Sequence, residues 1–195
     1  EIFVCEMGAR NVGDIKEICD IVHPDCGIIT SVGPQHLESF HTIDNIKKTK
    51  FELADSLPDD GIAFLNGNDE NIASVGYKRK NITYGVEAGD YQAYDLSLSS
   101  KGTTFKIKTP TGETAEFTTK LIGKHNVQNV AGAIACAHTL GVSLPQLAGA
   151  VRRLQSGCRS ARCPGSPWKA PAPAAPGSSS QHNRWKPAQQ YPDTP

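Results

Sequence analysis

Two residues of the segment 31–57, His36 and Lys50, have side chains that could bind a metal or act as a base or nucleophile. Thr42 is placed as an N-cap, and the apolar residues after it recur with the helical period, which predicts a helix. At 100° per residue Lys50 falls inside the apolar stripe of this helix, whereas Lys48 lies on the opposite face. A lysine that faces a core is costly unless its charge is lost or paired. Burial generally makes such an amine nucleophilic.

Both residues also have ordinary structural explanations. A lysine on the inner side of a helix can extend its ammonium to the surface, and a single histidine is often structural. His36 follows an apolar run, however, and its turn contains Gly33 and Pro34, a place where site residues are common. The occurrence of both in one segment favours a functional site.

Glu6 and Asn66 each end an apolar run that is typical of a buried strand. In parallel α/β sheets, ligands bind at the carboxyl ends of the strands. Glu6 is therefore a candidate Mg²⁺ ligand, and the amide of Asn66 is a candidate contact for a base or a sugar. A glutamate that caps a turn, or an asparagine in an Asx turn, would give the same pattern without a ligand.

The string GKHNVQN at 123–129 opens another predicted helix. Asn126 is its expected N-cap, with His125 and Asn129 on either side, and capping explains Asn126 but not the whole string. The sequence contains no GxxxxGK[ST] phosphate-binding loop. Any such loop is therefore expected upstream of Glu1, and the chain is expected to be a fragment.

The pattern of elements predicts how these residues are positioned. Apolar runs typical of buried strands alternate with helical spacing over residues 1–84, which predicts a mostly parallel α/β sheet with helices on both faces. From about 91 to 122, strict alternation and the turn signals SSKG and PTGE predict an antiparallel meander. The predicted strands are 2–5, 27–32, 61–66 and 81–85, and the predicted helices are 14–22, 43–57, 68–75, 127–140 and 144–154.

The composition of the chain argues against several classes of protein. Residues 1–156 carry 15 Lys and Arg against 19 Asp and Glu, and the basic residues do not cluster, which argues against nucleic-acid binding. No apolar stretch is long enough to span a bilayer. The six cysteines form no CxxC pair and no regular disulfide spacing, which is typical of reduced cytosolic thiols. We expect a cytoplasmic monomer.

Residues 156–195 differ sharply from what precedes them. From 157 onward the chain has no Ile, Leu, Val, Phe or Met, yet it holds eight of the thirteen prolines and both tryptophans. Such a segment cannot bury enough apolar surface to offset its ordering entropy, which predicts a disordered Pro/Ala/Ser-rich tail. Two explanations stay open, a linker and a reading frame that is wrong beyond this point.

Five strings resemble the central, ATP-binding domain of the Mur ligases in residues, order and spacing. They are EMGARNVGDI (6–15), GIITSVGPQHLESF (27–40), NIKKTKFELADSLP (45–58), LNGND (65–69) and GKHNVQNVAGAIA (123–135). The resemblance covers residues 1–155 and implies a fold like that of the P-loop NTPases, lacking here the P-loop strand. EMGA followed by GDI is most similar to the MurF branch, whose members add D-alanyl-D-alanine to UDP-N-acetylmuramoyl-tripeptide.

The resemblance also implies roles for the candidate residues. Lys50 matches a family lysine that is carbamylated by CO₂, and His36 matches the histidine that shares one Mg²⁺ with this carbamate. Glu6 matches the carboxylate on a second Mg²⁺, which bridges the ATP phosphates. The nucleotide-side motifs are matched by Asn66, His125, Asn126 and Asn129. The family reaction activates a carboxylate as an acyl phosphate, which an amine then attacks.

The sequence departs from the family pattern at both ends. The nucleotide loop and the UDP-sugar-binding domain have no counterpart, and the tail replaces a Gly-Arg step and a further domain, with Arg159 as a candidate remnant. We therefore expect the chain to be inactive alone. The alternatives are another amide ligase of the superfamily, MurE-like or folylpolyglutamate-synthetase-like, and a non-catalytic chain that keeps only the fold or a weak affinity for Mg²⁺-nucleotide.

Overall fold

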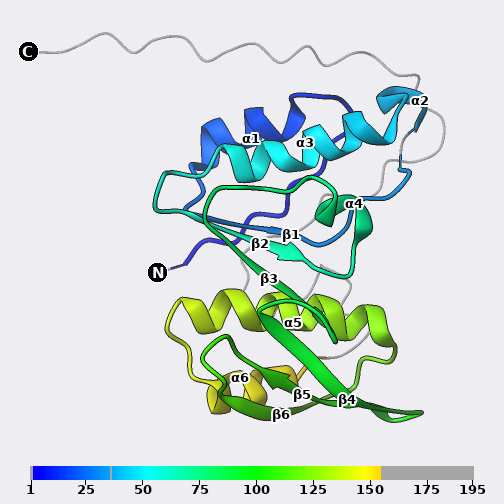
Figure 1. Cartoon of the computed structure of the whole chain (residues 1–195), viewed down its shortest axis with the longest axis vertical. Helices are drawn as coiled ribbons and strands as arrows, with labels where there is room; N and C mark the ends of the chain where they lie inside the picture. Colours follow the sequence, from blue (N-terminus) through cyan, green and yellow to red (C-terminus); the bar gives the residue numbers. More distant parts are fainter. Residues whose placement is uncertain (1, 36, 155–195) are drawn as a thin grey trace, which may run out of the picture. The chain divides into compact units, whose positions relative to one another are not determined.

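Six strands form one mixed sheet in which the strands lie side by side in sequence order (Figure 1). The computed structural model describes residues 2–35 and 37–154, without the side chain at 37. The strands are β1 (Cys26–Ile29), β2 (Ile62–Asn66), β3 (Asn81–Val86), β4 (Tyr91–Ser99), β5 (Gly102–Lys108) and β6 (Thr114–Thr119). Strands β1 to β4 are parallel to one another, and β4, β5 and β6 are antiparallel. The predicted parallel sheet and antiparallel meander are confirmed, and the two join into one sheet.

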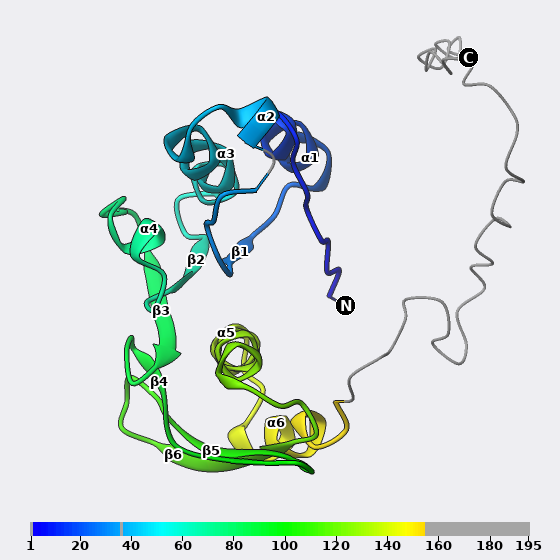
Figure 2. The same cartoon turned by 90° about the vertical axis from the view of Figure 1, so that its right-hand side faces the viewer.

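Helices cover both faces of the sheet. They are α1 (Asp14–Val22), α2 (Leu37–Phe40), α3 (Ile43–Asp55), α4 (Glu70–Ala73), α5 (Lys124–Thr139) and α6 (Leu144–Val151). On one face α1 packs on α3, α3 on β1, and α4 on β2. The sheet curls around α5, which contacts β2 to β5, and α6 packs against β6 (Figure 2). Among the described residues, no helix combines the length and the apolar character needed to cross a membrane.

Strand β2 separates two hydrophobic cores. Its residue Phe64 faces the core beneath α5 and α6, whereas Ala63 and Leu65 face the core beneath α3 and α4. This follows from strand geometry, because successive side chains point to opposite faces. A strand that is buried on both faces reads as a continuous apolar run, which is why residues 61–66 were predictable.

The prediction that residues 2–5 form a buried strand is wrong. Residues 2–5 have no regular secondary structure, and the side chains of Ile2, Phe3 and Val4 are 73%, 79% and 86% exposed. A strand needs a hydrogen-bonded neighbour to satisfy its backbone groups. Within the described residues β1 pairs only with β2, so residues 2–5 have no strand beside them. An apolar run predicts that its residues are buried, but it does not predict whether a neighbouring strand is present to pair with them.

Several element boundaries also differ from the prediction. Strand β1 ends at Ile29 instead of residue 32, α3 ends at Asp55 instead of residue 57, and α4 covers only the middle of the predicted helix 68–75. The start of α5 and the end of α6 differ as well. Helix α5 begins at Lys124, and its N-cap is Gly123 in the left-handed half of backbone space at φ 108°. Asn126 is therefore inside the first turn and is not the predicted N-cap; its amide Nδ2 donates to the Ile122 carbonyl at 2.8 Å. Helix α6 ends at Val151, before the predicted Leu154.

Strands β3 and β4 are parallel although only residues 87–90 connect them. Parallel neighbours normally need a crossover of a dozen or more residues. Here Glu87 at φ 57° and Gly89 at φ 86° reverse the chain twice within four residues. The Asp90 carboxylate closes the turn by accepting hydrogen bonds from the backbone N–H of Thr83 at 2.8 Å and from its hydroxyl at 2.7 Å.

Candidate functional site

Helix α3 carries Lys50 on the flank of its buried face. Thr42 caps the helix as predicted, because its hydroxyl accepts a hydrogen bond from the Asn45 N–H. Lys48 is exposed and Lys50 is half-buried, in the order that the helical spacing predicts. The neighbouring Thr49 is 1% exposed, and its hydroxyl has no hydrogen-bond partner among the described residues. Lys50 thus borders the core and is neither fully buried nor fully exposed.

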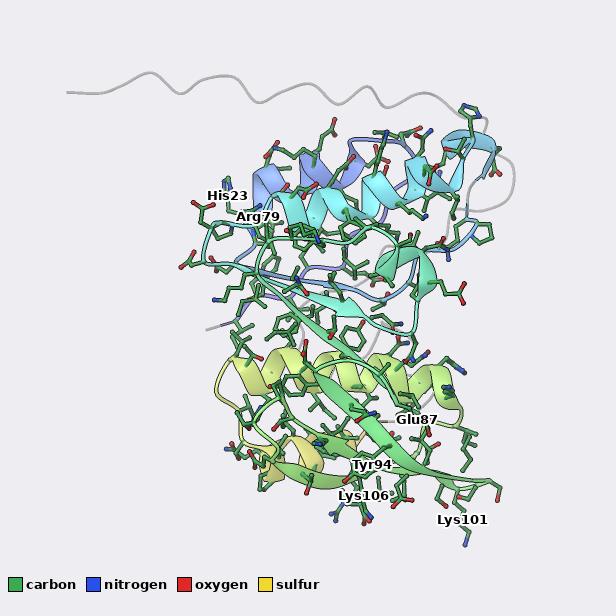
Figure 3. All side chains as sticks on the ribbon, in the orientation of Figure 1. His23, Arg79, Glu87, Tyr94, Lys101 and Lys106 are labelled. Carbon is green, nitrogen blue, oxygen red and sulfur yellow. The ribbon has the colours of Figure 1, made fainter. Side chains whose placement is uncertain are left out.

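The C-terminal end of α3 is fixed by two side chains from the segment between α4 and β3. The Tyr77 hydroxyl donates to the Ala54 carbonyl at 2.8 Å. The Arg79 guanidinium donates to the carbonyls of Asp55 at 3.0 Å and Leu57 at 2.9 Å. Figure 3 shows Arg79 beside this end of the helix. The last carbonyls of a helix lack intrahelical partners, so these donors hold α3 in place.

Replacing Arg79 with alanine should lower the free energy of unfolding by about 1 kcal/mol, because two helix-terminal carbonyls lose their donor at a partly exposed site. Urea unfolding of the 195-residue chain measures this change. The neighbouring Lys78 is exposed and has no such contact, so Lys78→Ala should stay within about 0.5 kcal/mol of the unsubstituted chain. Equal losses in both variants would contradict the anchoring role of Arg79.

Helix α3 also holds the segment that follows Glu6. One carboxylate oxygen of Glu52 accepts from the Gly13 N–H at 2.8 Å, and the other accepts from the Lys16 N–H at 3.0 Å. These bonds satisfy N–H groups at the start of α1, whose N-cap Gly13 has no side chain to do so. Glu6 itself is exposed and lies in irregular backbone.

Asp14 fastens the turn before α1. Its carboxylate accepts hydrogen bonds from the backbone N–H groups of Arg10 at 2.8 Å and Asn11 at 2.9 Å. These two backbone bonds lower the pKa of Asp14 below its ordinary value. The segment between Glu6 and α1 is therefore held by one carboxylate from α1 and one from α3.

Asn66 ends β2 and is almost fully buried at 6% exposure. Its Nδ2 donates to the Thr30 carbonyl at 2.8 Å, and its Oδ1 accepts from the Asn68 N–H at 3.0 Å. Among the described residues, one amide hydrogen and one lone pair of Asn66 have no partner. A cavity of about 200 Å³ lies beside it, lined by Asn66, Gly67, Ile72, Gly76, Tyr77 and Thr83 among others.

The remaining candidates lie in the first turns of α5. His125 and Asn129 are exposed, and Asn126 is half-buried with its amide on the Ile122 carbonyl. The His125 ring folds back over Gly123, where an added Cβ would lie 3.0 Å from the ring. In Figure 1 the start of α5 lies on the same, right-hand side as the carboxyl ends of β1 and β2. The fold thus brings the α5 candidates to the sheet edge at which Asn66 lies.

The predicted convergence of Glu6, His36 and Lys50 stays a prediction. Position 36 lies outside the described residues, as do Arg159 and the predicted tail 156–195. Across residues 2–35 and 37–154, no three His, Cys, Asp or Glu side chains gather into a complete set of metal ligands. Glu6 lies in the irregular segment before α1, and Lys50 lies in α3. Glu52 of α3 binds the backbone at the start of α1, which ties α3 to the helix that follows the Glu6 segment.

Residues 1–137 match the family model of the Mur ligase middle domain. The chain belongs to the Mur ligase family. Every candidate from Glu6 to Asn129 lies inside this match. The chain is 35% identical over 144 residues to the UDP-N-acetylmuramoyl-tripeptide–D-alanyl-D-alanine ligase of Bacillus subtilis, which covers 73% of this chain and 31% of that ligase. Identity to the Escherichia coli ligase of the same name is 29% over 158 residues, covering 78% and 35%.

Solved structures agree with this assignment. A crystal structure of MurF from Acinetobacter baumannii is similar with a TM-score of 0.71 at 28% identity, covering 80% of this chain and 34% of that one. MurF from Thermotoga maritima in complex with ADP gives a TM-score of 0.65 at 27% identity, covering 73% and 34%. This Mur ligase middle domain therefore spans about a third of the length of the relatives it matches.

Sequence reasoning missed the residues that hold the site segments in place. Glu52, Arg79 and Asp69 act on backbone groups far away in the sequence, and periodicity carries no signal for such contacts. Of these three residues, only Asp69 has a local sequence signal, because an aspartate before a short helical pattern indicates an N-cap. Its side chain does cap α4, accepting from the Ile72 N–H at 3.0 Å.

Proposed function

We propose that this chain is the ATP-binding central domain of an amide ligase that adds D-alanyl-D-alanine to UDP-N-acetylmuramoyl-tripeptide. The observation that carries the proposal is the joint similarity to MurF in sequence and in fold. The ADP complex of the Thermotoga maritima relative supports a nucleotide at this domain. The position of Asn66 and the start of α5 at one sheet edge agrees with the place where α/β sheets bind ligands.

Lys50 is proposed to act as a carbamate. Its amine would attack CO₂ and lose a proton, which converts a cationic side chain into an anionic one with two oxygens. The half-buried position of Lys50 suits this change, because the ammonium has no ion-pair or hydrogen-bond partner among the described residues. Its neighbour Thr49 has a buried hydroxyl with no partner in the same part of the chain.

The Glu6 carboxylate and the oxygens of a Lys50 carbamate would suit Mg²⁺, which prefers oxygen ligands and keeps several of its waters. The Glu6 carboxylate is exposed and makes no ion pair with any described residue, so it is free to bind a cation. The carbamate of Lys50 would supply further oxygen ligands, and His36 would supply a ring nitrogen. When bound, Mg²⁺ would neutralise charge that develops on the transferring phosphoryl group.

The reaction needs two bond-making steps. The γ-phosphoryl group of ATP passes to the tripeptide carboxylate, which gives an acyl phosphate and ADP. The amine of D-alanyl-D-alanine then attacks the acyl carbon, loses a proton and displaces phosphate. In this domain Asn66 and the first turns of α5, with His125, Asn126 and Asn129, would orient the nucleotide at the carboxyl edge of the sheet.

The test is substrate-dependent release of phosphate from ATP by the intact protein that contains this chain. We expect release to require UDP-N-acetylmuramoyl-tripeptide and D-alanyl-D-alanine together, and mass spectrometry should detect the pentapeptide product. Omission of either substrate is the internal control. Ligation of an amino acid to a shorter UDP-sugar peptide, or of glutamate to a folate, would instead assign the chain to another branch of the superfamily.

A further inference from the structure

Three side chains from the end of β2 and the start of α4 hold the backbone that follows β1. The Asn66 amide donates to the Thr30 carbonyl, the Asn71 amide donates to the Val32 carbonyl, and the Asp69 carboxylate accepts from the Val32 N–H, each at 2.8 Å. The partners lie 36, 39 and 37 residues apart in the sequence. We call Asn66, Asp69 and Asn71 the loop clamp.

The loop clamp provides hydrogen bonds to backbone groups that a neighbouring strand would otherwise satisfy. Strand β1 ends at Ile29, so the backbone at Val32 has no place in the sheet ladder. Val32 is nonetheless 2% exposed, within the core beneath α3 and α4. Its N–H and carbonyl would each cost free energy if they were buried without a partner. Asp69 and Asn71 satisfy both groups.

The Asp69 carboxylate joins two structures with its two oxygens. Oδ1 caps α4 through the Ile72 N–H at 3.0 Å, while Oδ2 holds the Val32 N–H. Asn71, in the first turn of α4, holds the other backbone group of Val32. The start of α4 and the loop 30–35 are therefore fixed to one another. In the sequence, this loop comes directly before position 36 and α2.

We propose that Asp69 and Asn71 are positioning residues, which hold the loop 30–35 at the carboxyl edge of the sheet for phosphoryl transfer. The proposal rests on the proposed function, because the loop matters only if it delivers a ligand to the ATP–Mg²⁺ site. Second-layer groups that fix a metal ligand typically change metal affinity or activity 10- to 100-fold, roughly, when they are lost. A displacement of about 1 Å has a similar effect on rate.

Asp69→Asn is the sharpest variant. Asparagine caps helices about as well as aspartate, so Oδ1 can still accept from Ile72. The second oxygen becomes an NH₂ group, which faces the Val32 N–H donor to donor. Asn71→Ala is the second variant, and it leaves the Asp69 carboxylate intact. The matched control is Asp90→Asn, since Asp90 also accepts two hydrogen bonds, from Thr83, and does not touch the loop.

The first measurement is amide hydrogen exchange by NMR on the full 195-residue chain. Asp69→Asn should speed exchange at the Val32 amide by at least about tenfold relative to core strand amides. Asp90→Asn should leave Val32 unchanged and speed exchange near Thr83. Unchanged exchange at Val32 in both clamp variants would overturn the proposal. Because rates are compared within one protein, a general loss of stability does not imitate the result.

The second measurement is the Mg²⁺ dependence of ligation by the intact enzyme. In Asp69→Asn the Mg²⁺ concentration for half-maximal rate should rise about tenfold or more, with little change in the KM for D-alanyl-D-alanine. Asp90→Asn should keep the original Mg²⁺ dependence. A loosened loop with unchanged Mg²⁺ dependence would overturn the positioning role. Absence of ligation by the unsubstituted enzyme would overturn the proposed function, and with it the role of the clamp, while leaving the exchange result intact.

Discussion

Lys50→Ala should reduce ligation by the intact enzyme by a factor on the order of 10³, while the circular dichroism spectrum and unfolding curve stay close to those of the unsubstituted protein. The reason is chemical, because alanine has no amine to form a carbamate and so removes two proposed oxygen ligands. Lys50 makes no ion pair or hydrogen bond with other described residues, so little stability depends on it. Phosphate release with both substrates measures the rate.

Two comparisons make this test specific to the carbamate. Lys48→Ala removes an exposed lysine two residues away on the same helix and should keep full activity. A short carboxylic acid, such as acetate or formate, should restore part of the activity of Lys50→Ala and none of the activity of a Glu6→Ala variant. Full activity of Lys50→Ala without added acid would end the carbamate hypothesis.

Gly132→Ala should lower the free energy of unfolding by about 1–3 kcal/mol, since the added methyl overpacks the core. Gly132 lies in α5 over the ring of Tyr84, and a Cβ there would be 2.6 Å from Cζ of that ring. The ring cannot move aside easily. Tyr84 is fully buried, and its hydroxyl donates to the Ile29 carbonyl at 3.2 Å. Urea unfolding of the 195-residue chain measures the change.

Gly149→Ala is the matched control, because Gly149 also lies inside a helix but a Cβ there meets nothing within 4 Å. Alanine is a better helix former than glycine, so this variant should gain about 0.5–1 kcal/mol. Opposite signs are expected for the same substitution at the two sites. A gain at Gly132 would mean that Tyr84 can shift, and that α5 is less closely packed on β3 than the structure shows.

Local patterns predicted the elements whose signal lies in their own residues. Helices α1 and α3 were predictable because apolar side chains recur at helical spacing, and Thr42 marked the start of α3. Strand β2 was predictable because it is buried on both faces. The GKHNVQN string located the start of α5. The predicted N-cap was Asn126, whereas the observed N-cap is Gly123, which has a positive φ.

Long-range hydrogen bonds were not predictable in the same way. The strand predicted at 27–32 ends at Ile29 because side chains 36 to 39 residues away take the backbone of Thr30 and Val32. The capping of α1 by Glu52 and the fixing of α3 by Arg79 have the same character. The candidate site residues could be proposed from residue types and spacing, whereas the groups that hold their segments in place are recognised only once distant segments meet.

The short turn between β3 and β4 has a consequence for how the chain folds. The entropic cost of closing a loop grows with the length of chain between the two contacts. Parallel strands are usually joined by a long crossover, so this cost is high for them. Residues 87–90 reduce that cost to that of a hairpin, and β5 and β6 follow by short turns. Every strand contact from β3 to β6 is therefore nearly local, whereas α3 separates β1 from β2. We expect β3 to β6 and α5 to form the folding nucleus, onto which β2, β1 and the Lys50 helix assemble later.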